Sequence, residues 1–419
     1  MGQFGPAGTE VSSSAASPRV AALRVAKFWG FTSGPAWGLS SLWYSQSHYE
    51  KNRNEKMRNV ENPFKFGTIV EDEYFTDRVQ EVAYIRQFVE SANHLVLISP
   101  RRFGKSSVVA KAVRQSGREH ITLNLQNVTS VTDFAEKLLR EYFKQHPVEH
   151  LKHLITHFRV IPTVSTNPLS GEMSISFQPS GDGSMMLEDV LMLLERAHSE
   201  KQRLIVVLDE FQEIRDISPM LEKQLRSIMQ TQQHINYILL GSQESMMADI
   251  FENKRSPFYH FGELMRLEKL PRNDFHNYLS ERLKGVFREK SSEIADRILD
   301  YTGCHPYYSQ QLAANVWQVG VLQPATADVV QTAIDNIVKA HGLDYERLWM
   351  KFNRTNRWIL QRLVIGAPLQ SGEHRTSTVY SALKRLQKEG YVIYSDHYEL
   401  EDPFYRQWII EEQYGTHAN

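Results

Sequence analysis

Short apolar runs alternate with helical patterns along the first part of the chain. The apolar runs lie at 95–98, 121–125, 204–208 and 237–240, and each predicts a strand. Apolar residues recur at helical spacing between them, in 79–89, 105–113 and 187–197. In the first of these helices, one face would carry Val79, Val82, Ile85, Phe88 and Val89. Strands that are apolar throughout and are separated by helices predict an α/β fold with a parallel sheet covered on both faces.

Three further patterns divide the chain. Residues 156–184 contain an alternating stretch at 173–177 and predict a β-hairpin inserted in the core. Residues 271–342 read as all helical, with a clear apolar stripe at Phe275, Tyr278, Leu279 and Leu283. The last stretch, 343–413, predicts helices and then short strands at 391–394 and 398–400, joined by a turn at 395–396. We therefore predict a core at 58–270, a helical lid at 271–342 and a winged helix at 343–413.

The first 57 residues have a different composition. Residues 1–49 hold one acidic residue, Glu10, and are rich in Ser, Ala, Gly and Pro without periodicity. Such a segment buries little apolar surface, so 1–57 is predicted to be disordered, or spurious if Met57 is the working start. A transit peptide is the alternative. Met1-Gly2 opens like a myristoylation signal, but Pro6 stands where that signal needs Ser or Thr.

Charge and cysteine content limit the partners and the compartment. Lys and Arg total 48 against 49 acidic residues, so a nucleic-acid contact would have to come from a local basic patch. The single cysteine, Cys304, rules out an internal disulfide and suits a reducing compartment. The chain has no apolar stretch of the length that a membrane span needs. These features predict a soluble, cytoplasmic protein.

The strongest chemical signal is the segment Ser99–Ser106, which lies between a predicted strand and a predicted helix. This is the context of a Walker A loop, whose backbone amides and helix N-terminus cradle phosphates. Lys105 would reach the β- and γ-phosphates, and the Ser106 hydroxyl would bind Mg²⁺. Ser99 replaces the usual first glycine, which requires a negative φ there. The loop residues predicted to bind the nucleotide are Arg102, Phe103, Gly104, Lys105, Ser106 and Ser107.

The second signal is the acidic pair Asp209-Glu210, which ends the most apolar strand. This is the Walker B pattern, and a buried parallel strand delivers both carboxylates to the edge of the sheet beside the phosphate loop. Asp209 would hold Mg²⁺, and Glu210 would orient and deprotonate the attacking water. We therefore predict that Lys105, Asp209 and Glu210 are catalytic and share one Mg-ATP site.

Weaker signals come from polar residues further along the chain. Ser242 or Gln243, after the next strand, would sense the γ-phosphate, and Arg255 or Arg266 would act as an arginine finger. The predicted helix that follows Arg375 carries basic residues outward, at Lys384, Arg385 and Lys388. It would enter a DNA groove or contact a protein partner, and the sequence does not decide between them.

Together these residues resemble the archaeal-type ATPases, a family in the STAND clade of AAA+ proteins, in a version familiar from Bacteroidetes-type bacteria. The resemblance covers roughly residues 60–412. Besides the two Walker motifs it rests on Asn62-Pro63-Phe64, Phe75-Thr76-Asp77-Arg78, Gly241-Ser242, Ser256-Pro257-Phe258-Tyr259 and Gly303-Cys304-His305-Pro306-Tyr307-Tyr308.

The resemblance implies a central phosphate-loop strand, Mg²⁺ as cofactor, and Phe75 and Arg78 near the adenine. Asp77 stands where the family usually has glycine. His305 and Pro306 match a lid motif that faces the nucleotide. We expect an ATP-hydrolysing molecular switch whose nucleotide state controls the lid and winged helix. The alternative is a nucleotide-gated DNA-binding or signalling adaptor with negligible turnover. A small-molecule kinase would have no use for Glu210 or the lid motif, and the oligomeric state stays open.

Overall fold

The computed structural model describes residues 61–68, 74–75, 78–146, 155–166, 173–177, 182–323, 326–369, 375–394 and 397–415. The predictions for residues 1–57, for Asp77 and for the turn at 395–396 lie outside these ranges. Residues Glu61–Asn419 form one unit by their contacts.

A five-stranded parallel sheet forms the core. Its strands run in the order β2-β5-β6-β1-β7. Their bounds are Leu95–Ile98 for β1, His120–Asn124 for β2, Leu204–Asp209 for β5, Ile235–Gly241 for β6 and Glu263–Arg266 for β7. The four predicted strands are confirmed, and β7 is additional. Its side chains are exposed or half-buried, so no apolar run marks it in the sequence. Because β7 pairs with β1 on the side away from β6, the phosphate-loop strand is an interior strand of the sheet, next to the middle strand β6.

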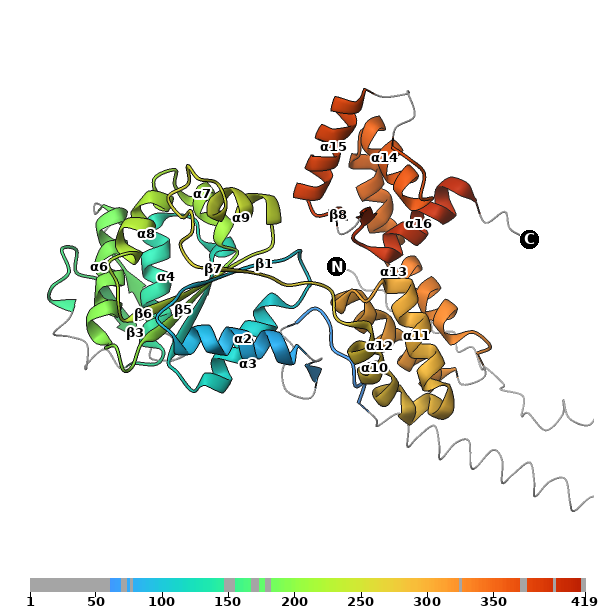
Figure 1. Cartoon of the computed structure of the whole chain (residues 1–419), viewed down its shortest axis with the longest axis horizontal. Coiled ribbons are helices and arrows are strands. Elements are labelled where there is room, and N and C mark those ends of the chain that lie inside the picture. The colour runs from blue at the N-terminus through green and yellow to red at the C-terminus, as the bar shows by residue number, and fades with distance from the viewer. Residues whose placement is uncertain are drawn as a thin grey trace, which may run out of the picture. The chain divides into compact units, whose positions relative to one another are not determined.

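Helices cover both faces of this sheet (Figure 1). Leu95 and Leu97 of β1 face one hydrophobic cluster, and Val96 and Ile98 face the other, as the alternation of side chains along a strand requires. The first cluster contains α2 (Val79–Glu90) and α3 (Lys105–Ser116). The second contains α4 (Val131–Phe143), α6 (Gly183–Ala197), α8 (Leu221–Met229) and α9 (Glu244–Phe251). Val79 was predicted to lie on one apolar face with Val82, but it is 71% exposed, because α2 packs only from Val82 onward.

The predicted hairpin is present between α4 and α6. Strand β3 (Thr163–Thr166) pairs antiparallel with β4 (Met173–Ser176), with Val164 opposite Ile175. Ile175 and Phe177 are buried in the same hydrophobic cluster as α4 and α6. Short elements complete this part of the chain: η2 (Leu125–Asn127), η3 (Phe211–Glu213) and α7 (Ile214–Ile217).

A third hydrophobic cluster joins the helices that follow the sheet. The predicted stripe is buried there, from Phe275 to Leu283. The bounds are α10 (Arg272–Phe287), η4 (Arg288–Lys290), α11 (Ser291–Thr302), α12 (Pro306–Leu322), α13 (Val329–Lys351), α14 (Arg354–Val364), α15 (Thr376–Lys388), β8 (Val392–Tyr394), β9 (Tyr398–Leu400) and α16 (Pro403–Tyr414). The helix–helix–hairpin order predicted for a winged helix is present. The boundary predicted at 342 lies inside α13, since Gly342 continues the helix.

Candidate nucleotide-binding site

The register of the sheet brings three strand ends to one rim. Ile98, the last residue of β1, pairs with Gly241, the last residue of β6, and Leu208 of β5 pairs with Leu239. The Ser99 amide also donates a 3.3 Å hydrogen bond to the Gly241 carbonyl. The loop after β1, the acidic pair of β5 and Ser242 after β6 therefore meet at the carboxyl edge, where ligands bind in open parallel sheets.

The loop after β1 has the backbone of a phosphate cradle. Gly104 has φ 86° and Arg102 has φ 66°, so two residues of this short loop are left-handed. A Cβ added to Gly104 would meet no atom of the described residues within 4 Å, so glycine is needed there for its conformation. Ser99 keeps a φ outside the left-handed region, and a serine fits in place of the first glycine. Helix α3 begins directly at Lys105, which aims its positive dipole end at this loop.

Lys105 is buried against its own loop. Its side chain is only 6% exposed, and Nζ donates to the carbonyl oxygens of Ser99 and Pro100 at 3.3 Å each. Burial lowers the pKa of Lys105, although the charges of Glu210 and Asp209 act in the opposite direction. The lysine thus lies between the phosphate loop and the two acids, where a triphosphate would offer it better acceptors.

Ser106 and Asp209 form the pair expected at a magnesium site. The Ser106 hydroxyl donates a 2.7 Å hydrogen bond to Oδ2 of Asp209. In octahedral coordination at about 2.0–2.1 Å, neighbouring oxygen ligands lie about 2.9 Å apart. The two oxygens are therefore already close to the spacing of adjacent Mg²⁺ ligands, and both are hard donors of the type that Mg²⁺ prefers. These residues fit the ion.

Glu210 is held in one orientation. Its Oε2 accepts hydrogen bonds of 2.6 Å from the Ser242 hydroxyl and of 2.6 Å from the Gln212 amide. Burial would raise the pKa of Glu210, but these two bonds and the charge of Lys105 lower it overall. Its backbone is left-handed, with φ 55°, a strained conformation that clusters at functional sites. Glu210 is thus an ionised, oriented carboxylate beside the phosphate loop.

A cleft of about 630 Å³ opens in front of the phosphate loop, within the range of ligand pockets. Helix α12 contributes to its wall, and aromatic side chains cover another part of it: Phe66, Tyr74, Phe75 and Tyr307. Most of the predicted nucleotide-binding residues line it: Arg78, Arg102, Phe103, Gly104, Lys105, Ser106, Ser107, Glu210 and Pro306. Residues from the core and from the lid region therefore face one cavity.

Arg78 lines this cleft and forms hydrogen bonds to three segments around it. It is 5% exposed and donates to the Glu268 carbonyl at 2.6 Å, to Glu81 at 2.7 Å and to the Phe103 carbonyl at 3.4 Å. Glu268 lies in the connection between β7 and α10. Arg78 therefore links the phosphate loop to the segment that leads into α10.

Some predicted residues lie elsewhere. Six predicted residues are not among the described residues that line the cleft: Asp209, Ser242, Gln243, Arg255, Arg266 and His305. Asp209 nevertheless contacts the lining residue Ser106. His305 is 2% exposed, packs behind Phe103 with ring centroids 4.8 Å apart, and caps α12 by accepting from the Tyr307 amide. The family motif at His305 is therefore not directed at the cleft, because its ring serves the helix start and the core.

Two residues that the sequence analysis did not assign to the site, Arg101 and Gln212, contact its functional side chains. Arg101 lines the cleft, and its Nε lies 3.5 Å from the Ser242 hydroxyl. Arg266 instead forms an ion pair with Glu252. Gln212, which holds Glu210, was also missed. The position of Arg101 inside the Walker A segment was the available signal, and Gln212 is recognisable only once its contact with Glu210 is seen.

A parallel sheet that presents a phosphate loop, its lysine and an acidic pair at one rim defines a P-loop ATPase. Residues 75–312 match the family described as an ATPase domain predominantly from Archaea, and the chain belongs to that family.

Solved structures share the fold. The Walker-type ATPase PABY2304 of Pyrococcus abyssi is similar with a TM-score of 0.59 and 14% identity, over 84% of this chain and 99% of that one. The ORC2 protein of Aeropyrum pernix, in its ADPNP–ADP complexes, is similar with a TM-score of 0.51 and 14% identity, over 83% and 96%. No curated protein matches the chain. At these identities the likeness concerns the fold alone.

Proposed function

We propose that the protein hydrolyses ATP in this cleft and works as a molecular switch of the STAND type, in which the bound nucleotide sets the position of the lid and winged helix. The observation that carries the proposal is a chain of side-chain contacts. It leads from the phosphate loop, through α12, to the end of the wing.

Arg102 is the first member of that chain. Its guanidinium donates a 2.7 Å hydrogen bond to the Tyr308 hydroxyl, and that hydroxyl donates at 2.5 Å to Glu401. Glu401 directly follows β9, and the guanidinium also lies 4.7 Å from the centre of the Tyr307 ring. Burial alone would lower the pKa of Arg102, but Tyr308 and Glu401 raise it overall, so the charge is retained.

The location of Arg102 explains how nucleotide would act on this chain. Arg102 belongs to the loop that cradles phosphate, and a triphosphate is a stronger acceptor for guanidinium than a phenol oxygen. When ATP binds, Arg102 turns to the phosphates and releases Tyr308, which loosens the link to Glu401. When the phosphates leave, the contact forms again. A ligand shifts such an equilibrium by its differential affinity for the two states.

The same residues supply the hydrolytic chemistry. Ser106 and Asp209 would hold Mg²⁺, which would supply positive charge to the β- and γ-phosphates. Lys105 contributes a second positive charge on the phosphate side of the cleft. Glu210 accepts a proton from the attacking water, and Ser242 and Gln212 hold its carboxylate in place for that transfer. A protein that only bound nucleotide would need no oriented base at this position.

Phosphate release tests the proposal. Glu210→Gln keeps the size of the side chain and removes the base, so we expect ATP binding to persist and steady-state phosphate release to fall by about 100-fold or more. Glu200→Gln, an exposed position, is the matched control. If the wild-type protein releases phosphate no faster than Glu210→Gln, the enzyme proposal fails and the adaptor remains.

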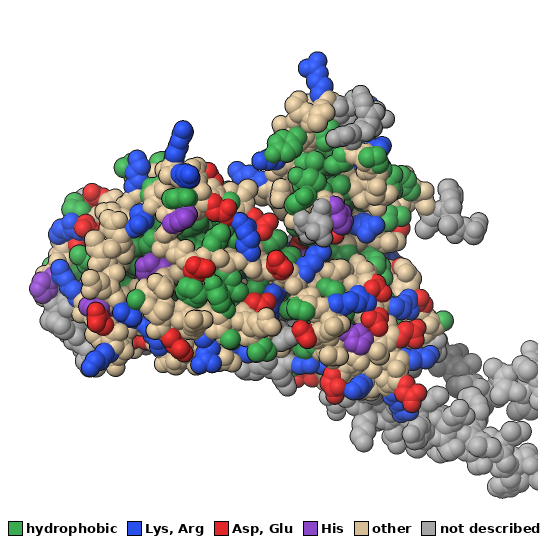
Figure 2. Space-filling model, in the orientation of Figure 1, with side chains coloured by type: hydrophobic (Ala, Val, Ile, Leu, Met, Phe, Trp, Pro, Cys, Tyr) green, Lys and Arg blue, Asp and Glu red, His purple; other side chains and the backbone are tan. Residues whose placement is uncertain are grey.

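The adaptor alternative concerns α15. Arg375, Lys384, Arg385 and Lys388 are all exposed there, and Arg385 also donates to Asn356 of α14 at 2.9 Å, which links α15 to α14. Basic and acidic side chains are interspersed on the face seen in Figure 2. DNA contact stays a prediction of the sequence. If α15 binds DNA, the affinity for DNA should fall steeply with salt concentration and in the double variant Lys384→Ala plus Lys388→Ala. Unchanged DNA affinity would favour a protein partner for α15 instead.

The compartment is also a proposal. No helix in the described part of the chain is both long and apolar enough to cross a membrane. From this finding and the single cysteine we infer that the protein is cytoplasmic. Fractionation of cells that express the natural gene would test this.

A further inference from the structure

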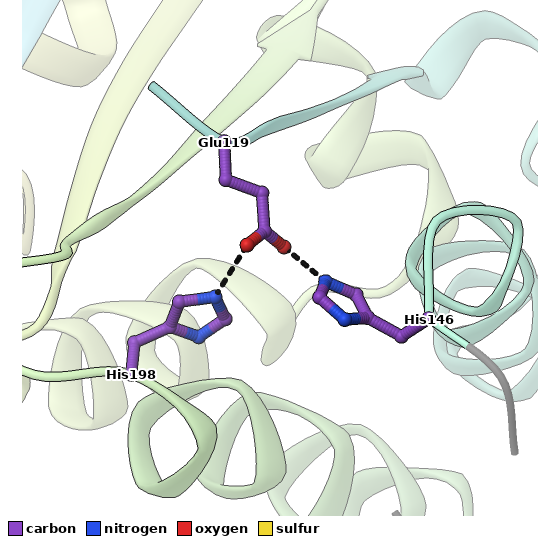
Figure 3. Close-up of side chains that lie close together, drawn as sticks. All are labelled: Glu119, His146 and His198. Atoms are coloured by element: carbon purple, nitrogen blue, oxygen red, sulfur yellow. Dashed lines mark hydrogen bonds and ion pairs between the residues drawn. The ribbon is translucent and has the colours of Figure 1, made fainter. Parts of the chain in front are cut away.

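Three potential metal ligands converge far from the nucleotide cleft. Glu119 directly precedes β2, His146 follows the end of α4, and His198 ends α6 (Figure 3). One donor atom from each lies within 4.8 Å of the other two. Because β2 starts beside Glu119 and the sheet is parallel, this cluster lies at the amino ends of the strands. The phosphate loop lies at the opposite rim.

We propose that Glu119, His146 and His198 form a binding site for one Zn²⁺ ion that ties β2, α4 and α6 together. The inference is independent of ATP hydrolysis. The nucleotide site uses oxygen donors for Mg²⁺, whereas two imidazoles and one carboxylate are a typical set for Zn²⁺ and a poor set for Mg²⁺ or Ca²⁺.

The spacing of the donors fits such an ion. The Glu119 carboxylate lies between the two rings, with one oxygen hydrogen-bonded to His146 Nε2 and the other 3.4 Å from His198 Nε2. Tetrahedral zinc with bonds of about 2.0–2.2 Å places neighbouring donors about 3.3–3.5 Å apart. The three donors therefore lie close enough together to share one ion, with the fourth position left to water.

The orientation of His198 is the second observation that points to a ligand. Its Nδ1 lies 2.8 Å from the Leu194 carbonyl oxygen and must donate to it. In the neutral ring this leaves the lone pair on Nε2, the atom that faces the cluster. Such a backbone acceptor behind the ring is typical of metal-binding histidines. The His198 side chain is 5% exposed, so its ring is held in this position.

The surroundings favour a cation. Both histidines lie at C-terminal ends of helices, where the dipole is negative, and Glu119 adds a full negative charge. The Tyr142 ring packs against His146 at 4.4 Å and His198 at 5.8 Å between centroids, and limits their movement. Without metal, the same three groups form an ion-pair network, which is the competing explanation.

Metal uptake by the full-length protein distinguishes a zinc site from an ion-pair network. The protein is stripped with chelator, exchanged into buffer at pH 7.5 and titrated with ZnCl₂ alone, because protons compete with metal for imidazole. We expect one zinc per chain by elemental analysis and a rise in Tm. His198→Gln and Glu119→Gln should each weaken zinc affinity by at least about tenfold and abolish the rise in Tm.

Control variants address the other histidines. His120→Gln removes a neighbour outside the cluster and should bind zinc like the wild type. His150→Gln plus His153→Gln alters two histidines outside the described residues and should also retain zinc. Circular dichroism checks that each variant is folded. If the wild type takes up no zinc, or if only the His150/His153 pair matters, the proposed site does not exist and the cluster is an ion-pair network.

Discussion

The Ser106 hydroxyl and the Asp209 carboxylate, 103 positions apart in sequence, lie 2.7 Å from each other. This contact unites the two motifs on which the nucleotide site depends. It exists because β1 and β5 are both neighbours of β6, so the loop after one and the last residue of the other emerge at the same rim.

Loss of the Ser106 hydroxyl should weaken nucleotide binding only when magnesium is present. In Ser106→Ala one oxygen ligand is missing, and a lost bond to a charged group costs about 1.5–3 kcal/mol, or roughly 10- to 150-fold in affinity. Titration of a fluorescent ATP analogue, with Mg²⁺ and with EDTA, measures the difference. Ser116→Ala at the other end of α3 is the control, since its hydroxyl donates to the Val113 carbonyl and accepts from the Arg118 amide, both local contacts away from the phosphate loop. Equal weakening in EDTA would contradict a metal role.

Tyr308→Phe should uncouple the winged helix from the nucleotide. The ring is kept, but the hydroxyl that accepts from Arg102 and donates to Glu401 is lost. We expect ATP binding to stay within about threefold of wild type. The nucleotide-dependent change in hydrogen exchange of 392–401 should disappear.

Tyr301→Phe supplies the comparison for that experiment. It removes a hydroxyl that bonds the Pro403 carbonyl at 3.2 Å, so it loses a contact between α11 and the start of α16 without touching the phosphate loop. In Tyr301→Phe, the hydrogen exchange of 392–401 should still change when ATP binds. The same loss of response in both variants would argue against a specific path through Arg102.

His94 should make the protein sensitive to acid. Burial, together with the charge of Arg226, lowers the pKa of His94 from 6.5 to about 4, while Nδ1 accepts from the Tyr237 amide and the ring stacks on Phe261. The unfolded chain therefore binds the proton first. The neutral ring contributes stability that is full above about pH 6.5 and falls as the pH drops toward 4, by about 3 kcal/mol.

Urea unfolding at several pH values measures this effect. His94→Gln does not titrate, so the difference in free energy of unfolding between wild type and variant should shrink by that amount between pH 7 and pH 4. A difference that is constant with pH would show that His94 is protonated equally in both states.

Arg78→Leu should destabilise the core. The side chain keeps apolar bulk but leaves the part-buried bond to the Glu268 carbonyl and the buried bond to the Phe103 carbonyl unmade, which costs about 2–4 kcal/mol. Arg86→Leu, on the same helix, removes a side chain that is 43% exposed and should change the free energy of unfolding by less than about 1 kcal/mol. Similar losses in both variants would refute a special role for Arg78.

Local patterns in the sequence were enough to find most of the elements and the two Walker motifs. Apolar runs such as 204–208 are strands because they are buried on both faces, and the residues that follow them must then lie at a strand end. The helix–helix–hairpin order and the inserted hairpin were equally visible, since turn residues and alternation are local signals.

Contacts between distant segments were decided only by the tertiary structure. Strand β7 has no apolar run and exists because its backbone pairs with β1, while Gly342 continues a helix that neighbouring packing stabilises. His305 packs against Phe103 and caps the start of α12, and Arg101 lies within hydrogen-bond distance of Ser242. The convergence of Glu119, His146 and His198 could not be anticipated either. By itself the sequence identified the two Walker motifs. Which residues meet was set by strand order and packing, because hydrogen bonds and metal ligation depend on ångström distances that no local pattern encodes.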